Sequence, residues 1–84
     1  MKMPTTKEQI EINRSYIKKE LDRIHHVASK AQLYAAVLFH WAPLSGCLET
    51  VVAYFEDYTE GKWWLEDKEN TYKRLGVEYT TYIL

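Results

Sequence analysis

The sequence has one cysteine, Cys47, among its 84 residues. A single cysteine cannot form a disulfide within the chain, and it excludes the zinc sites that need paired cysteines. Chains this short bury a modest share of their surface, and they usually gain stability from a disulfide, a structural metal or a partner chain. We therefore expect a partner chain to contribute. A lone thiol also favours a reducing, cytoplasmic compartment.

Glycine and long apolar runs are scarce too. The three glycines, Gly46, Gly61 and Gly76, form no phosphate-binding loop. The first twelve residues hold no apolar run that could serve as a signal sequence. Polar residues interrupt the most apolar stretch, 27–42, which is too short and too polar to span a bilayer. We expect residues 1–84 to form a single helical domain with no membrane attachment.

The net charge of −1 argues against a general nucleic-acid binder. The charge is nevertheless uneven along the chain. Residues 1–30 hold seven basic and four acidic residues, a net +3, whereas residues 43–84 hold four basic and eight acidic residues, a net −4. A domain polarised in this way can associate with a basic partner or pair head to tail with itself, although a solvated acidic face is the simpler explanation.

The longest periodic segment predicts a first helix from residue 6 to residue 41. A capping box at Thr5 and Glu8 precedes it, and Pro43 ends it. Such a helix would be about 54 Å long, so we expect a bend or break near residues 25–29. Its apolar positions alternate steps of four and three, which is the spacing of a helix packed lengthwise on another: Ile17, Leu21, Ile24, Ala28, Ala31, Ala35 and Leu38.

Residues 27–42 are apolar almost all round this expected helix. A helix that is apolar on all sides is buried on all sides. In so small a domain, that requires a central position or a second copy of the chain. We expect a homo-oligomer that associates through Leu33, Ala36 and Phe39.

Two further helices and a tail complete the expected fold. Residues 44–60 separate apolar and acidic arcs and predict an amphipathic helix capped by Gly61. Residues 63–75 predict a third helix that ends at Gly76, and residues 77–84, rich in β-branched and aromatic side chains, predict an extended tail that lies on the helices or pairs with another chain. The expected class is all-α. In the alternative, residues 50–58 and 62–67 form a hairpin, which gives an α+β fold with a long helix and a small antiparallel sheet.

Several short motifs lie in the second half of the chain. They are Leu48-Glu49, Tyr54-Phe55 and Glu60-Gly61-Lys62-Trp63, followed by Glu66-Asp67 and Glu69. Together they resemble a short bacterial helical family of unknown function, which has a Tyr-Tyr pair and a Gly-x-Trp step before acidic residues. The segment from Lys73 to Val77 is similar to the family's Lys-Arg-Gly-Val step, with Leu75 inserted and the usual Ser-Glu-Asp missing. The resemblance implies a helix over residues 44–60 and implies no activity.

Candidate catalytic and metal-binding groups are few. The only soft-ligand set is His25, His26 and His40 with Cys47. Adjacent histidines on a helix diverge by about 100°, and Asp22 with His26 offers at most half a site, so we expect no metal. Cys47 or Ser45 could act as a nucleophile with His40 as base, but Cys47 fits better as a small apolar residue on a helix face. We expect neither enzymatic activity nor a cofactor.

Aromatic residues are in excess, since three Trp, seven Tyr and two Phe exceed what one small core can hide. Exposed Trp and Tyr are typical of binding hot spots, and we expect Trp63, Tyr79 and Tyr82 to be exposed. The carboxylates of residues 56–67 are too solvated for acid–base catalysis but suit the docking of a basic surface. The predicted partner contacts are Glu56, Asp57, Glu60, Trp63, Trp64, Tyr79 and Tyr82.

These features predict a small regulatory or inhibitory protein that binds another protein and associates with itself. Its size suits an accessory protein of a bacterium or phage, for example an anti-defence inhibitor. Alternatively, the chain sequesters a small ligand such as a nucleotide at an oligomer interface, held by stacking and charge. The residues for that site would be Arg14, Tyr16, Lys18 and Tyr34. A third possibility is an assembly subunit whose only partner is itself.

Overall fold

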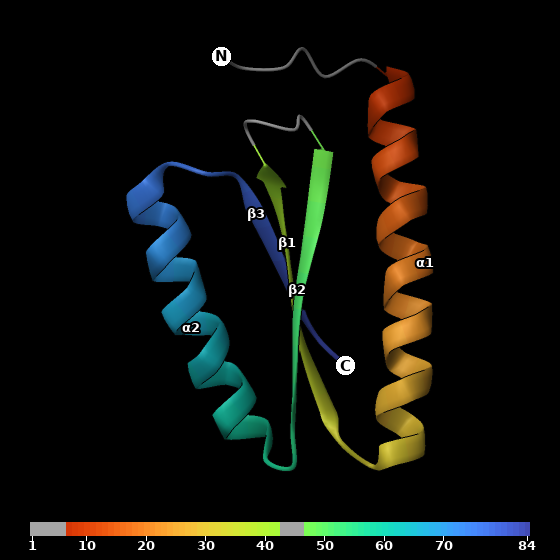
Figure 1. Cartoon of the computed structure of the whole chain (residues 1–84), viewed down its shortest axis with the longest axis vertical. Helices are drawn as coiled ribbons and strands as arrows, with labels where there is room; N and C mark the ends of the chain where they lie inside the picture. The colour runs from red at the N-terminus through yellow and green to blue at the C-terminus, as the bar shows by residue number, and fades with distance from the viewer. Residues whose placement is uncertain (1–6, 43–46) are drawn as a thin grey trace.

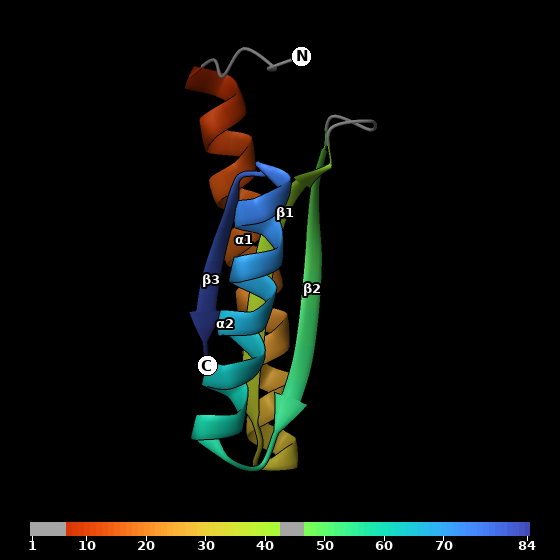
Figure 2. The same ribbon diagram turned by 90° about the vertical axis from the view of Figure 1, so that its left-hand side faces the viewer.

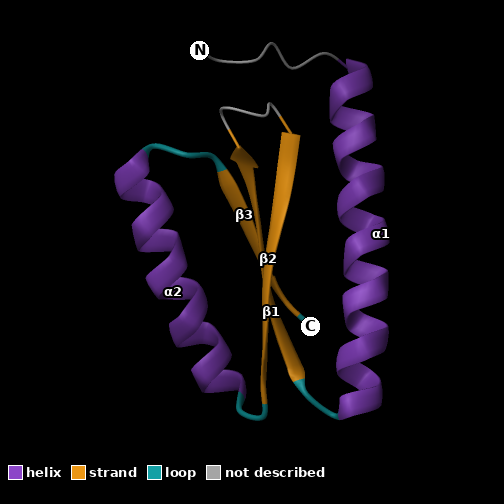
Figure 3. Cartoon of the chain, viewed as in Figure 1, coloured by secondary structure: helices purple, strands orange, loops and turns teal. Residues whose placement is uncertain are grey.

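The computed structural model describes residues 7–42 and 47–84 as two helices packed on the two faces of a three-stranded sheet (Figures 1 and 3). The strands are all antiparallel, in the order β2-β1-β3, so β1 is central. The helix α1 covers one face of the sheet and α2 covers the other (Figure 1). Along the chain the elements are α1 (Lys7–Ala31), β1 (Tyr34–Ala42), β2 (Cys47–Phe55), α2 (Tyr58–Leu75) and β3 (Tyr79–Ile83).

The expected all-α class is therefore wrong, and the fold is α+β. The main cause is residues 34–42, which form the central strand instead of continuing the first helix. Both faces of this strand are covered, so it is apolar at every position except His40 and lacks the alternation of a half-exposed strand. Short runs of this kind cannot be distinguished from a buried helix by periodicity alone.

Helix α1 ends ten residues before the expected residue 41. Gln32 adopts a left-handed conformation with φ 57°, and the N–H of Leu33 donates to the Ala28 carbonyl oxygen over 2.9 Å. This turn reverses the chain so that β1 runs back along the helix (Figure 1). The expected break near residues 25–29 is thus displaced to residues 32–33. Thr5 and Pro43, which were expected to bound the helix, lie outside the described residues.

Residues 47–55 form β2, so the helix expected over residues 44–60, also implied by the bacterial resemblance, is wrong. The expected alternative hairpin of residues 50–58 and 62–67 is not the one observed either. Instead β2 pairs with β1, from Ala42 opposite Cys47 to Tyr34 opposite Phe55. Apolar residues on both sides of an edge strand blur the period of two, because this strand too has a helix on each face of its sheet.

The second half of α2 and the tail agree with expectation. Gly76 ends α2 in the left-handed region with φ 70°, and its N–H donates to the Lys73 carbonyl oxygen over 3.1 Å. The tail is extended as expected, since β3 pairs with β1 from Ala36 opposite Ile83 to His40 opposite Tyr79. The start of α2 differs, because the helix begins at Tyr58 and Gly61 lies buried inside it rather than capping a preceding helix.

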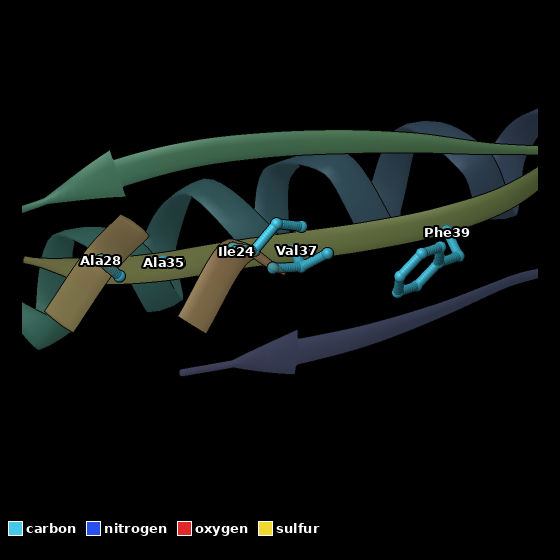
Figure 4. Close-up of a cluster of buried hydrophobic side chains, with 5 residues drawn as sticks. All are labelled: Ile24, Ala28, Ala35, Val37 and Phe39. Carbon is cyan, nitrogen blue, oxygen red and sulfur yellow. The ribbon is translucent and has the colours of Figure 1, made fainter. Parts of the chain in front are cut away.

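The core consists of two apolar clusters that share β1. Ala35, Val37 and Phe39 point towards α1, where they meet Ile24 and Ala28 (Figure 4). Ala36 and Leu38 point towards α2, where they meet Leu65. None of the described helices is long and apolar enough to cross a membrane.

The residues expected to mediate self-association lie mostly inside this core. Phe39 has an exposed fraction of 0% and Ala36 one of 1%, while Leu33 is half-buried. Strand alternation sends Phe39 and Ala36 to opposite covered faces, where they contact the chain's own helices. Neither side chain is available to a second copy in this fold, which corrects the expected contact through Ala36 and Phe39.

Two glycine substitutions should change stability in opposite directions. A Cβ at Gly61 would meet its nearest neighbour, Cδ2 of Phe55, at an ordinary 3.6 Å, so Gly61→Ala should raise the free energy of unfolding by about 0.5–1 kcal/mol through a better helix propensity. Gly76→Ala should lower it by about 1 kcal/mol, because alanine is strained at φ 70°. Urea unfolding of both variants checks this pair, and a stabilising Gly76→Ala would contradict the assigned helix end.

Candidate protein-binding surface

The acidic residues at the start of α2 are exposed, and one of them shapes the helix. Asp57 is the N-cap, with φ −111° and ψ 129°, and its carboxylate accepts a hydrogen bond from the Thr59 N–H over 3.3 Å. Glu60 lies in the first turn, where a negative charge interacts favourably with the helix dipole. Glu56 precedes the cap and is exposed. Asp57 therefore serves the helix, while Glu56 and Glu60 remain directed to solvent.

Trp63 is exposed on the outer side of α2, with an exposed fraction of 65%. Residues three and four positions apart are neighbours on a helix surface. The neighbours of Trp63 in this sense include Glu60, Glu66 and Asp67, all of which are exposed. Three exposed carboxylates therefore share this side of the helix with the indole ring. We call Glu60, Trp63, Glu66 and Asp67 the Trp63 surface.

The adjacent Trp64 is turned by about 100° around the helix axis and packs against the sheet. Its ring lies 6.1 Å from the Phe55 ring, and the Lys68 ammonium lies 5.5 Å from the centre of the indole. Together with the buried Leu65, Trp64 packs α2 against the sheet. Trp64, expected as a partner contact, is therefore half-buried in the core, whereas Trp63 is available to a partner.

A second aromatic pair lies at the end of the molecule where α2 begins (Figure 1). Tyr34 starts β1 and Tyr58 starts α2, and their rings pack edge to face with centres 5.7 Å apart. Both are nearly half exposed, and the Lys62 ammonium lies 6.0 Å from the Tyr58 ring centre. This pair exists because the β1–β2 register places Tyr34 opposite Phe55, three residues before Tyr58.

A shallow groove of about 390 Å³ runs between α2 and β3. Within it, the Thr81 hydroxyl donates to the Glu69 carboxylate over 3.1 Å. Glu66 belongs both to this groove and to the Trp63 surface, so the two are continuous. The groove is lined by Tyr58, Lys62, Leu65, Glu66, Glu69, Thr81, Tyr82 and Ile83.

The tail tyrosines do not join the Trp63 surface. Tyr79 is half-buried in the cluster under α2, and Tyr82 is half-buried on the α1 side, with its ring 6.0 Å from Phe39. The expectation that both are exposed needs correction, because β3 lies in a sheet covered on both faces. Tyr82 contributes to the groove, but neither ring lies in a shared patch with Trp63.

The residues expected to hold a nucleotide are separated within one chain. Arg14 and Lys18 are exposed in the first half of α1, whereas Tyr34 follows the end of this helix, about 25 Å of helix rise from Arg14 and about 20 Å from Lys18. Tyr16 is engaged internally: its hydroxyl is hydrogen-bonded to Thr50 Oγ1 over 2.9 Å, and its ring packs edge to face on Phe39. These four residues do not form a site within one chain, and a site shared between two copies stays a prediction.

The histidines are dispersed as well. His25 and His26 are exposed on α1, while His40 stacks on Tyr72 with ring centres 4.7 Å apart and places Nε2 3.6 Å from a Glu49 carboxylate oxygen. In the part of the chain that the structure describes, no three His, Cys, Asp or Glu side chains form a group able to hold a metal ion. Cys47 is exposed at the start of β2, not on a helix face as expected, and Ser45 lies outside the described residues.

Tyr34, Tyr58 and Lys62 were not predicted to be surface neighbours, because their proximity depends on the strand register. One local signal was available. Asp57 and Glu60 are spaced as a helix-start motif, with an N-cap acid and a glutamate three residues later. Recognising it would have placed Trp63 in the second turn of a helix beginning at Tyr58, with acidic neighbours on its outer face.

Substitutions of the two acidic residues before α2 should change the free energy of unfolding by different amounts. Asp57→Ala removes the N-cap and should lower the free energy of unfolding by about 1 kcal/mol. Glu56→Ala, the matched control, should change it by less than about 0.5 kcal/mol because Glu56 is exposed and does not cap the helix. Chemical unfolding of both variants provides the measurement, and equal losses would contradict the cap assignment.

Comparison with known proteins leaves this surface to be interpreted from its own chemistry. No family model, curated protein or solved structure matches the chain. The resemblance of residues 48–69 to a short bacterial helical family stays a prediction.

Proposed function

We propose that this chain is a small non-enzymatic regulatory or inhibitory protein that acts by binding a basic segment of another protein. The observation that carries the proposal is the Trp63 surface, an indole with an exposed fraction of 65% among three exposed carboxylates. Trp is one of the three residue types most enriched in binding hot spots, together with Tyr and Arg.

The chemistry of this surface suits a lysine or arginine side chain. A cation is attracted to the face of an aromatic ring, most strongly to tryptophan. Arginine also stacks its planar guanidinium on such a ring while it donates hydrogen bonds to nearby carboxylates. Because Glu60, Glu66 and Asp67 are exposed, each ion pair alone contributes little, about 0–1 kcal/mol. Most of the affinity should therefore come from Trp63, with the carboxylates selecting a basic partner.

The groove extends the surface beyond a single side chain. Glu66 belongs to both the Trp63 surface and the groove, which is also lined by Leu65 and Glu69. A partner segment whose basic residue contacts Trp63 can place its flanking residues in this groove. The exposure of the carboxylates also supports binding over acid–base catalysis, which needs desolvated carboxyl groups.

Helix α2 presents this surface rigidly. Leu65 has an exposed fraction of 6% and Trp64 packs on Phe55, so the inner side of the helix is anchored to the sheet. The Asp57 and Gly76 caps define its two ends. A binding surface held on a rigid element loses less conformational entropy when the partner binds.

The test is binding to peptide arrays that differ only in charge, followed by titration with Trp63→Ala. Lysine- and arginine-rich peptides should bind, matched glutamate-rich peptides should not, and added salt should weaken binding. Trp63→Ala should weaken binding at least about tenfold, as hot-spot truncations do. The matched control is Leu75→Ala, which removes an apolar side chain of similar exposure, 67%, at the far end of the same helix.

Leu75→Ala should leave the affinity unchanged, and both variants should keep the unfolding midpoint of the parent chain. Equal binding of acidic and basic peptides would contradict the proposal. So would an affinity that is insensitive to Trp63→Ala.

A further inference from the structure

The strand β2 is an open edge of the sheet, and no described element of the chain lies beyond it (Figure 2). It is nine residues long, contains no proline, glycine, lysine or arginine, and has Glu49 as its single charged residue. Natural edge strands are usually protected by being short or by carrying lysine, proline or bulges. The sequence of β2 has none of these residues, so its edge is suited to pairing with another strand.

The pairing pattern shows which residues of β2 direct their backbone N–H and C=O groups away from the sheet. Ala35 and Leu84 exchange two backbone hydrogen bonds, of 3.1 and 2.9 Å, between β1 and the end of β3. Residues of a central strand alternate between its two neighbours, so the even-numbered residues of β1 bond to β2. In this register the backbone N–H and C=O groups of the odd-numbered residues of β2 are directed towards β1. The backbone N–H and C=O groups directed away from the sheet are those of Leu48, Thr50, Val52 and Tyr54.

We propose that β2 pairs antiparallel with β2 of a second copy of this chain, with Val51 at the two-fold axis. The two three-stranded sheets would then form one continuous sheet. In this register Thr50 exchanges backbone hydrogen bonds with Val52 of the second copy, and Leu48 does so with Tyr54 of the second copy. These four residues are the ones whose backbone groups face outward.

The strand that pairs with this edge comes from a second copy of the chain, because β2 is complementary to itself. A two-fold interface requires that one surface match its own rotated image. About Val51, Glu49 lies opposite Ala53 of the second copy, so no like charges meet. On the α1 face, the half-buried Leu48 and Val52 lie opposite Tyr54 and Thr50 of the second copy. Pairing therefore satisfies the outward backbone groups and covers apolar side chains together.

The other edge of the sheet is less suited to this role. Strand β3 has five residues, and the groove between it and α2 continues into the Trp63 surface. A dimer through β2 uses neither that groove nor Trp63. The proposed dimer is therefore independent of the proposed function, and each can fail without the other.

The register makes a charge-dependent prediction at residue 53. Ala53→Lys would place a lysine opposite Glu49 of the second copy twice per dimer, and Ala53→Glu would place a glutamate there instead. Opposite charges at facing positions stabilise strand pairs, and like charges destabilise them. Sedimentation equilibrium should show a dimer of the parent chain, tighter for Ala53→Lys and weaker for Ala53→Glu. The two variants should differ about tenfold or more in dissociation constant.

A chain that stays monomeric up to millimolar concentration would overturn the proposal. Open-ended aggregation would also overturn it. So would equal dimer dissociation constants for Ala53→Lys and Ala53→Glu. Because either variant could disturb the fold, thermal unfolding accompanies both. Hydrogen exchange of the parent chain is the second measurement. The amides of Leu48, Thr50, Val52 and Tyr54 should gain protection as concentration rises, and unchanged exchange at all four would also refute the interface.

Discussion

The structure depends on the double burial of the central strand. Five consecutive residues of β1, from Ala35 to Phe39, have exposed fractions of 0–1%. Alternate side chains feed two separate clusters, one under each helix, and both edges of the strand are hydrogen-bonded to neighbours. Each helix therefore packs on the face of β1 that it covers, and side chains of β2 and β3 extend both clusters.

The same arrangement accounts for most of the aromatic residues. A sheet with a helix on each face has two apolar layers, and together they hold more rings than one core of the same chain length. Tyr16, Phe39 and Tyr82 pack on the α1 side. On the α2 side lie Phe55, Trp64, Tyr72 and Tyr79. The aromatic excess is thus largely absorbed by the fold, which makes the remaining exposure of Trp63 more informative.

Two features are left unpartnered once these layers are filled. The outer side of α2 carries an indole with carboxylates as its helix neighbours, and the outer edge of β2 carries backbone groups beside which residues 7–42 and 47–84 place no further strand. They differ in chemistry, since the first offers a side-chain surface of negative charge and the second offers backbone hydrogen bonds flanked by apolar side chains. The proposed binding surface and the proposed self-pairing edge are compatible because they share no residue.

Some of this could be predicted from residues close together in the sequence. The end of α2 at Gly76, the extended tail and the divergence of Trp63 from Trp64 follow from local preferences and helix geometry, and all are observed. The acidic setting of Trp63 was equally accessible, because helix neighbours are three and four residues apart.

The strands β1 and β2 were decided only by the tertiary structure. A strand satisfies its backbone through partners distant in the sequence, and its alternation disappears when helices cover both faces of the sheet. Residues 34–42 therefore carry a pattern that fits a buried helix as well as a buried strand. Their state became evident only when β2, β3 and both helices were in place around them, and with it the proximity of Tyr34 to Tyr58.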